Sequence, residues 1–135
     1  MQTRKIWVVL TVLAGVILAG CRTSANIKLD GTSWVLTSLN GQAVLSSTQV
    51  TINFVKDVVN GSDGCNNYSS TYTLKGSQFK IDGRIIGTMM ACQDPIMKQA
   101  TAYHAAMQEA TSAKVDGQQL TLLDANKKPI AVFKK

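Results

Sequence analysis

Histidine, cysteine and carboxylate side chains, on which most metal sites and acid–base catalysts depend, are scarce in this sequence. The 135 residues include one histidine, three cysteines and eight aspartates and glutamates. His104 therefore has no second histidine with which to share a metal, and no Cys-x-x-Cys pair occurs. The carboxylates are also not spaced as a pair that could act as general acid and general base in catalysis. We expect no metal, no catalytic residues and no cofactor, so the protein is predicted not to be an enzyme.

Aromatic residues are also few, at 6% of the sequence, and the positive charges are spread along the chain. From Cys21 onward the net charge is +4, because two of the 14 basic residues and none of the eight acidic residues come earlier. Several lysines stand alone: Lys56, Lys75, Lys80, Lys98 and Lys114. A nucleic-acid interface needs clustered basic residues with interleaved aromatic residues. The distribution instead predicts a solvated, mildly basic surface and no nucleic-acid partner.

Only one long apolar run is present, and it lies at the start of the chain. Residues 6–19 are apolar apart from Thr11 and Gly15, and they follow the positive charges of Arg4 and Lys5. A run of about fifteen residues would measure about 22 Å as a helix, whereas the hydrocarbon core of a bilayer is about 30 Å thick. The run is too short for a comfortable transmembrane anchor. It is typical of a secretory signal peptide, which we assign to residues 1–20.

The end of this run predicts lipidation. Leu18-Ala19-Gly20-Cys21 resembles the bacterial lipobox, in which the cysteine is acylated and becomes the mature N-terminus. Two or more acyl chains give stable membrane attachment, since each buried methylene contributes about 0.8 kcal/mol. Arg22 rather than aspartate follows, which in a Gram-negative host implies the outer membrane, with the domain facing the periplasm. We expect residues 21–30 to form a polar tether, lipidated at Cys21.

After residue 30, the main pattern is the alternation of apolar and polar residues over stretches as long as a β-strand. Val50, Ile52 and Phe54 alternate with polar neighbours, which is typical of a half-buried strand. Other alternating stretches are residues 34–36, 68–74, 79–82, 120–122 and 130–132. Turn-forming dipeptides separate them: Asn40-Gly41, Asn60-Gly61, Asp63-Gly64, Lys75-Gly76, Asp82-Gly83 and Asp116-Gly117. We expect residues 61–64 to form a tight turn with positive φ. The pattern as a whole predicts six to eight strands.

One segment has helical periodicity instead. Asp94-Pro95 is typical of an N-cap followed by proline in the first turn. Apolar residues then recur at steps of three and four: Ile96, Ala100, Tyr103, Met107 and Ala110. An amphipathic helix is therefore predicted over about residues 94–111. Short strands with one helix indicate a mainly β fold, an antiparallel barrel or sandwich whose open end or edge the helix covers.

Three motifs of this chain resemble those of the META domain family, also called HslJ-like. The first is the opening stretch of residues 31–41 with Trp34. The second, Gly61-Ser-Asp-Gly64-Cys65-Asn66, matches the family signature G-x-x-G-C-N. The third, residues 87–92, contains Met90 and Cys92 and leads into a proline and a helix. The resemblance covers residues 31–135 and implies a small lipocalin-like β-barrel with one helix.

The resemblance also implies a biological setting. The family is implied to occur as bacterial envelope lipoproteins. Its bacterial prototype is associated with heat shock and novobiocin resistance, and other members are associated with motility. No family-wide enzymatic mechanism comes with it. Many members carry Thr-Arg-Met before the second cysteine, whereas Thr88 is followed directly by Met89 here, so any role of that arginine does not carry over.

Cys65 and Cys92 remain once Cys21 is acylated, and their state is open. An even number of cysteines in an oxidising compartment favours a disulfide. The alternatives are two buried free thiols or, less favoured, a metal site. Cys65 or Cys92 could also act as a nucleophile with His104 as its base, but such a catalytic pair would need a third group to orient the histidine. His104 lies one step off the apolar stripe of the helix, so we expect it to be a partly exposed residue.

The remaining expectations concern packing and function. Four methionines are expected to fill the core rather than bind copper: Met89, Met90, Met97 and Met107. We predict a monomeric, non-enzymatic lipoprotein that supports stress or antibiotic tolerance through contacts with other envelope components. The alternative is a carrier or sensor that takes a small apolar ligand into the barrel. Bulky residues expected to point inward favour a filled interior: Trp34, Phe54, Tyr72, Phe79 and Phe133.

Overall fold

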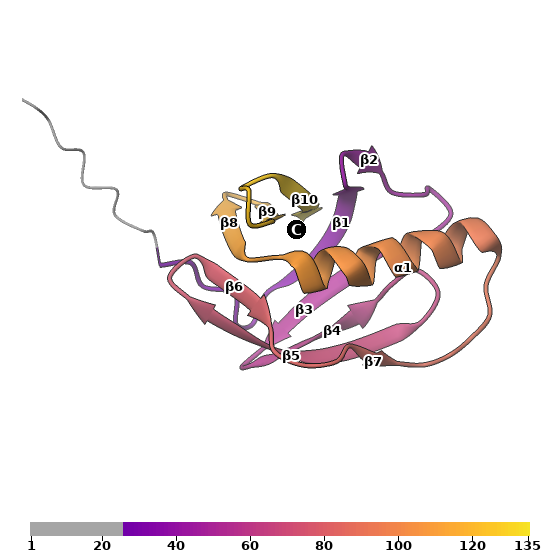
Figure 1. The fold of residues 1–135 in the computed structure, drawn as a ribbon, viewed down its shortest axis with the longest axis horizontal. Helices are drawn as coiled ribbons and strands as arrows, with labels where there is room; N and C mark the ends of the chain where they lie inside the picture. Colours follow the sequence, from indigo (N-terminus) through magenta and orange to yellow (C-terminus); the bar gives the residue numbers. More distant parts are fainter. Residues whose placement is uncertain (1–25) are drawn as a thin grey trace, which may run out of the picture.

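Eight antiparallel strands form a closed barrel in the computed structural model, which describes residues 26–135 (Figure 1). The ring consists of β1 (Ser33–Leu39), β3 (Thr51–Val55), β4 (Val58–Ser62), β5 (Asn67–Lys75), β6 (Gln78–Ile81), β8 (Ser112–Asp116), β9 (Gln119–Leu123) and β10 (Pro129–Lys134). Pairing of β10 with β1 closes it. Two short strands, β2 (Gln42–Ala43) and β7 (Ile86–Gly87), are added to β1 and β5. This confirms the predicted mainly β barrel of six to eight strands with one helix.

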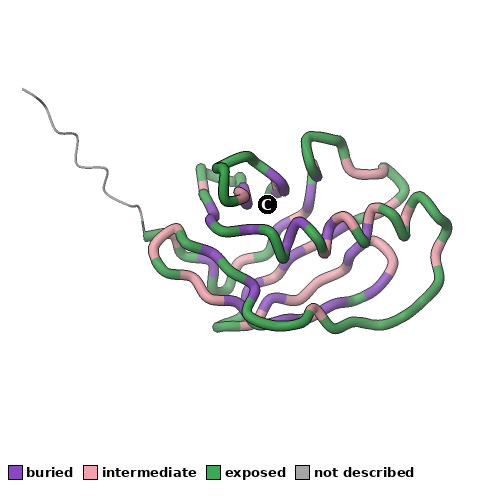
Figure 2. Tube along the Cα trace, viewed as in Figure 1, coloured by how far each residue is buried: buried purple, intermediate pink, exposed green. Residues whose placement is uncertain are grey.

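Most strands of the barrel have one apolar face. Buried positions alternate with more exposed ones along β3, β5 and β6 (Figure 2). The five bulky residues expected to point inward are all buried, and Phe54 and Phe133 have no exposed surface. Burying one such side chain stabilises the fold by about 1.5–3 kcal/mol. Side chains thus fill the interior of the barrel.

The helix α1 (Asp94–Glu109) lies across one side of the barrel and packs on β1, β6 and β10 (Figure 1). Its buried face consists of Ala100, Tyr103, Ala106 and Met107, close to the predicted stripe. The predicted cap is one residue off, because Gln93 is the N-cap and makes no side-chain hydrogen bond. Asp94 lies in the first turn instead, where a negative charge interacts favourably with the helix dipole.

Two local expectations are corrected by the strand register. Asn60 and Gly61 do not form a turn but lie in β4. Glycine is required at position 61 because a Cβ at this position would collide with the carbonyl oxygen of Thr51. In β10 an irregularity after Pro129 shifts the alternation. Ala131 and Phe133 are therefore fully buried, whereas Val132, an apolar residue of the predicted alternating stretch 130–132, is only half-buried.

The folded domain begins before residue 31. Leu29 is buried, and the carboxylate of Asp30 accepts a hydrogen bond from the backbone N–H of Lys56 at 2.6 Å. The tether predicted over residues 21–30 is thus too long at its C-terminal end, because an apolar side chain at position 29 completes the core. The predicted signal peptide, residues 1–20, and the lipidation site Cys21 lie outside the described residues. Within residues 26–135, no helix combines the length and apolar character needed to cross a bilayer.

Candidate functional site

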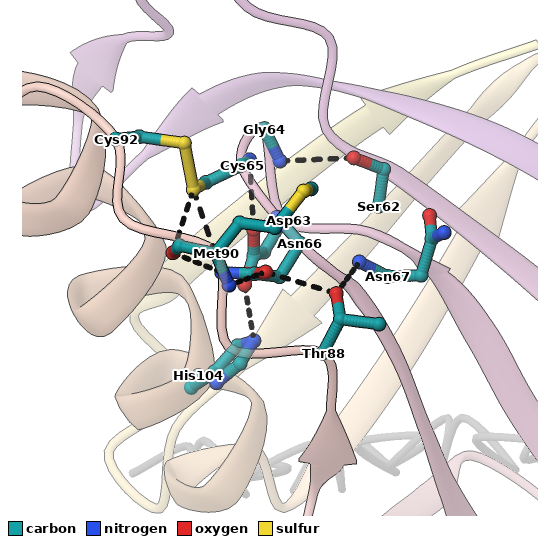
Figure 3. The surroundings of a disulfide bond; sticks show 10 residues. All are labelled: Ser62, Asp63, Gly64, Cys65, Asn66, Asn67, Thr88, Met90, Cys92 and His104. Atoms are coloured by element: carbon teal, nitrogen blue, oxygen red, sulfur yellow. Dashed lines mark hydrogen bonds and ion pairs between the residues drawn. A yellow bond between two sulfur atoms is a disulfide. The ribbon is translucent and has the colours of Figure 1, made fainter.

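The G-x-x-G-C-N signature forms a turn organised by Asp63, between β4 and β5 (Figure 3). The Asp63 side chain is buried, and its Oδ1 accepts hydrogen bonds from the backbone N–H groups of Cys65 at 2.8 Å and Asn66 at 2.6 Å. Gly64 has a φ of +95°, a conformation that other residues rarely adopt. The tight turn with positive φ is thus confirmed for Gly64, although Gly61 belongs to the strand before it.

A disulfide joins this turn to the segment before the helix. Cys65 and Cys92 are bonded, with Cα atoms 6.0 Å apart and a sequence separation of 27. The prediction of a disulfide is therefore confirmed over two free thiols. Because each sulfur is bonded to the other, neither is present as the thiol that a cysteine–histidine nucleophile would need.

Asn66 holds the segment between β7 and α1 with its side-chain amide (Figure 3). Its Oδ1 accepts hydrogen bonds from the backbone N–H of Met90 at 2.6 Å and from Oγ1 of Thr88 at 2.9 Å. Its Nδ2 donates to the carbonyl oxygen of Met90 at 3.1 Å. The amide thus pairs with both backbone groups of Met90, as a neighbouring strand would. Residues 88–91 are fixed in place without belonging to a strand.

His104 connects the helix to the same turn. Its Nε2 lies 3.2 Å from Oδ2 of Asp63, and the ring is 33% exposed, which agrees with the predicted partial exposure. Nε2 itself is buried and makes no hydrogen bond of good geometry. Within residues 26–135 this is the only close contact between a basic and an acidic side chain. Sequence reasoning missed it, since Asp63-Gly64 indicated only a turn and nothing local links it to position 104.

A pair of buried tyrosines lies beside this contact. The hydroxyls of Tyr68 and Tyr103 are 2.6 Å apart, and Tyr68 also donates to the carbonyl oxygen of Thr51 at 2.9 Å. Since each hydroxyl has one proton, Tyr103 must be the donor to Tyr68. Burial raises the pKa of both hydroxyls well above the usual tyrosine range, because it disfavours the charged phenolate.

An open groove of about 340 Å³ lies between residues 88–91 and α1. We call it the methionine groove, because Met89, Met90 and Met97 line it, together with Asp63 and His104. These methionines are 97%, 57% and 37% exposed. Their predicted role as core filler is wrong. Asn66 holds Thr88 and Met90 along the outside of the barrel, and Met97 is not on the buried face of α1. Only the fourth methionine, Met107, is in the core.

The predicted motif residues divide into two groups. Gly64, Cys65, Asn66, Met90 and Cys92 come together at the turn and the methionine groove, as Figure 3 shows. Trp34 is instead part of the core, where its Nε1 donates to Oγ1 of Thr32 at 2.8 Å. Across residues 26–135, no three histidine, cysteine, aspartate or glutamate side chains gather as a metal site would require.

Comparison with known proteins adds a family and a fold. The family model of the META domain matches residues 27–135. An NMR structure of a protein from Burkholderia xenovorans is similar, with a TM-score of 0.64 and 30% identity over 78% of this chain and 82% of the other. A second NMR structure has a TM-score of 0.63 and 26% identity over 78% of this chain and 90% of the other. No curated protein matches the chain significantly.

Proposed function

Because the chain belongs to the META domain family, we propose that it is a non-enzymatic binding protein of the bacterial cell envelope that contacts another envelope component through the methionine groove. In this proposal a lipid on Cys21 attaches it to a membrane, the outer membrane of a Gram-negative host, and the domain faces the periplasm. Stress or antibiotic tolerance would follow from that contact.

The observation that carries the proposal is the exposure of three methionines on a rigid frame. An exposed cluster of large apolar side chains is unfavourable in water unless a partner covers it. Met89 and Met90 are nevertheless held outward by the disulfide and by the hydrogen bonds of Asn66. A frame that is ordered before binding lowers the entropic cost of association. Methionine side chains adapt to varied apolar partners, which suits a recognition surface.

The filled barrel argues against a ligand in its interior. Trp34, Phe54, Phe79, Tyr103 and Phe133 occupy that space and are almost fully buried. A small apolar ligand remains the second candidate, but in the methionine groove rather than the barrel. The groove volume of about 340 Å³ is at the lower end of the range for small-molecule sites.

Site-specific photocrosslinking in intact envelopes tests the main proposal. A photoreactive residue at Thr101, which lines the methionine groove, should form one discrete adduct with an envelope protein. The same residue at Lys114, an exposed position of β8 outside the groove, serves as the control. Replacing the three groove methionines by glutamine should abolish the adduct at position 101, whereas replacing them by leucine should preserve it. An adduct that survives the glutamine changes would refute the proposal.

The second candidate has its own measurement. An apolar fluorescent dye titrated into the purified domain should bind in the groove and lose affinity in the glutamine variant but not in the leucine variant. Dye binding without a crosslink would favour the small ligand over the protein partner.

Membrane attachment is tested separately. The chain purified from its host should have an intact mass that corresponds to residues 21–135 plus acyl groups. Radioactive palmitate should label the wild type and not the Cys21→Ser variant. An unmodified sulfur at position 21 contradicts the anchor while leaving the groove proposal open.

A further inference from the structure

We propose that a second site, a basic depression next to the start of the domain, binds the phosphate groups of anionic membrane lipids. Three lysines line it: Lys75, Lys80 and Lys127. This site lies outside the methionine groove and adds a membrane-facing surface to the proposed function, whose anchor at Cys21 it presupposes.

Three separate segments bring these lysines together. Lys75 ends β5, Lys80 lies in β6, and Lys127 lies in the turn between β9 and β10. The depression between them has a volume of about 670 Å³, and the end of α1 contributes Gln108 to its lining. In the sequence Lys75 and Lys80 stand alone and Lys127 is more than 45 residues away, so the fold alone creates this concentration of charge.

The positive charge of the depression is only partly neutralised within the domain. None of the three lysines makes an ion pair, since the only close contact between a basic and an acidic side chain among residues 26–135 is His104–Asp63. Asp82 is the one carboxylate that lines the depression and offsets one of its three positive charges, and its Oδ2 accepts a hydrogen bond from Oγ1 of Thr73 at 2.5 Å. Lys127 donates to Oγ of the buried Ser112 at 3.3 Å, which holds its ammonium at the rim with further N–H donors free.

The start of the described chain lies beside this depression. Asn26 lies next to the β5–β6 turn, because a Cβ added to Gly76 in that turn would be 3.8 Å from Oδ1 of Asn26. Gly76 follows Lys75 directly. Five residues of extended chain, from Cys21 to Asn26, span at most about 18 Å. A lipid on Cys21 would therefore keep the depression within a short distance of the lipid headgroups. The methionine groove shares no lining residue with this depression and lies between residues 88–91 and α1, beside the disulfide that joins the β4–β5 turn to the β7–α1 segment (Figure 3).

Phosphate groups of lipids fit this charge and position. Lysine binds phosphate as a point charge, and three lysines in one depression can contact a single headgroup or adjacent headgroups. Each lysine held at an anionic surface raises the partition coefficient about fivefold, so three together would raise it about a hundredfold. Salt should weaken the effect, because the lysines are solvent-exposed.

Sedimentation with vesicles tests the site. A chain beginning at residue 21 with Cys21→Ser contains the whole fold, because every barrel strand and core residue lies within residues 29–134. It should bind vesicles of phosphatidylglycerol mixed with phosphatidylcholine and not vesicles of phosphatidylcholine alone. The variant K75Q/K80Q/K127Q should bind about a hundredfold more weakly, while K75R/K80R/K127R should bind like the parent chain. Circular dichroism should show that each variant remains folded.

A charge-matched control separates the site from net charge. The variant K98Q/K114Q/K134Q removes the same charge from exposed lysines outside the depression and should lose much less affinity. Equal loss in the two glutamine variants would overturn the proposal, as would equal binding to both kinds of vesicle. Binding of inorganic phosphate without vesicle binding would overturn the lipid assignment. Glutamine at the three groove methionines should leave vesicle binding unchanged, so failure of either proposal can be recognised separately.

Discussion

Asn66 and Asn67 are adjacent and chemically identical, but their environments differ completely. The Asn66 side chain is buried and bonded to Met90 and Thr88, whereas Asn67 is exposed and only its backbone contributes to the site. The Asn66 amide can bond both backbone groups of Met90, since it donates and accepts at the same time. The same residue type thus positions a neighbouring segment at position 66 and only faces solvent with its side chain at position 67.

The two asparagines form a matched pair for mutagenesis. Asn66→Ala should lower the free energy of unfolding by about 2 kcal/mol, because it leaves backbone groups of Met90 without partners. Asn67→Ala should change it by less than about 0.5 kcal/mol. Urea unfolding followed by circular dichroism measures both. Equal effects of the two changes would show that the Asn66 hydrogen bonds do not hold the segment.

The tyrosine pair predicts loss of stability at alkaline pH. In the folded state the pKa of Tyr68 and of Tyr103 is raised by burial, whereas in the unfolded chain it is about 10. The folded state therefore keeps protons that the unfolded state releases above about pH 10, and stability is complete below that pH and falls above it. Urea unfolding between about pH 7 and 11 should show this decline.

Tyr103→Phe isolates this contribution. It removes the hydrogen bond to Tyr68 and should cost about 1 kcal/mol at neutral pH. It should also make the alkaline decline shallower than in the wild type, because one raised pKa is lost. An unchanged slope would mean that other groups, such as lysines, cause the decline.

At the scale of elements, the segment between β7 and α1 depends on its covalent link rather than on strand pairing. Residues 88–93 are neither strand nor helix, and they are held to the barrel by the Asn66 side chain, the backbone of Asn67 and the Cys65–Cys92 bond. A segment of this kind needs fixed points at both ends, because it has few buried apolar side chains of its own.

Replacing both cysteines by serine should destabilise the domain by about 3.5 kcal/mol, the loop-closure entropy of a bond that spans this length of chain. The melting temperature of the double variant under oxidising conditions measures the effect. The amide of Met90 should also exchange with solvent faster, since Asn66 would then hold it alone. A small loss of stability, under about 1 kcal/mol, would show that the turn and the segment are held together without the bond.

At the scale of the whole molecule, the barrel has one weak seam. β4 and β5 pair at five positions, whereas β6 and β8 pair only at Gln78 and Ser112, flanked by two backbone hydrogen bonds. The helix and its connections, residues 82–111, intervene in sequence between these two strands. A closed ring with one narrow contact should open there first.

Hydrogen exchange measured by NMR tests this expectation. The amides of Phe79 and Ala113, which bond across the seam, should exchange at least about tenfold faster than the amide of Tyr72, which bonds to Asp57. Equal protection of the three amides would contradict a local opening and indicate that the barrel unfolds as one unit.

Local patterns in the sequence determined the classes of element and much of the core. Alternation in residues 50–54 predicts a strand and periodicity in residues 96–107 predicts the helix, because both patterns depend on neighbours a few residues apart. The even pair of cysteines likewise predicted the disulfide. Lipidation of Cys21 is also a prediction from sequence alone.

Only the tertiary structure decided which distant residues meet. The Asp63–His104 contact, the exposure of Met89 and Met90, and the gathering of Lys75, Lys80 and Lys127 all depend on how the barrel closes. Even the side on which Val132 faces changes with one irregularity of register. The physical reason is that strand pairing joins segments far apart in the chain, and the energy that selects one register is spread over the whole core rather than stored in any local motif.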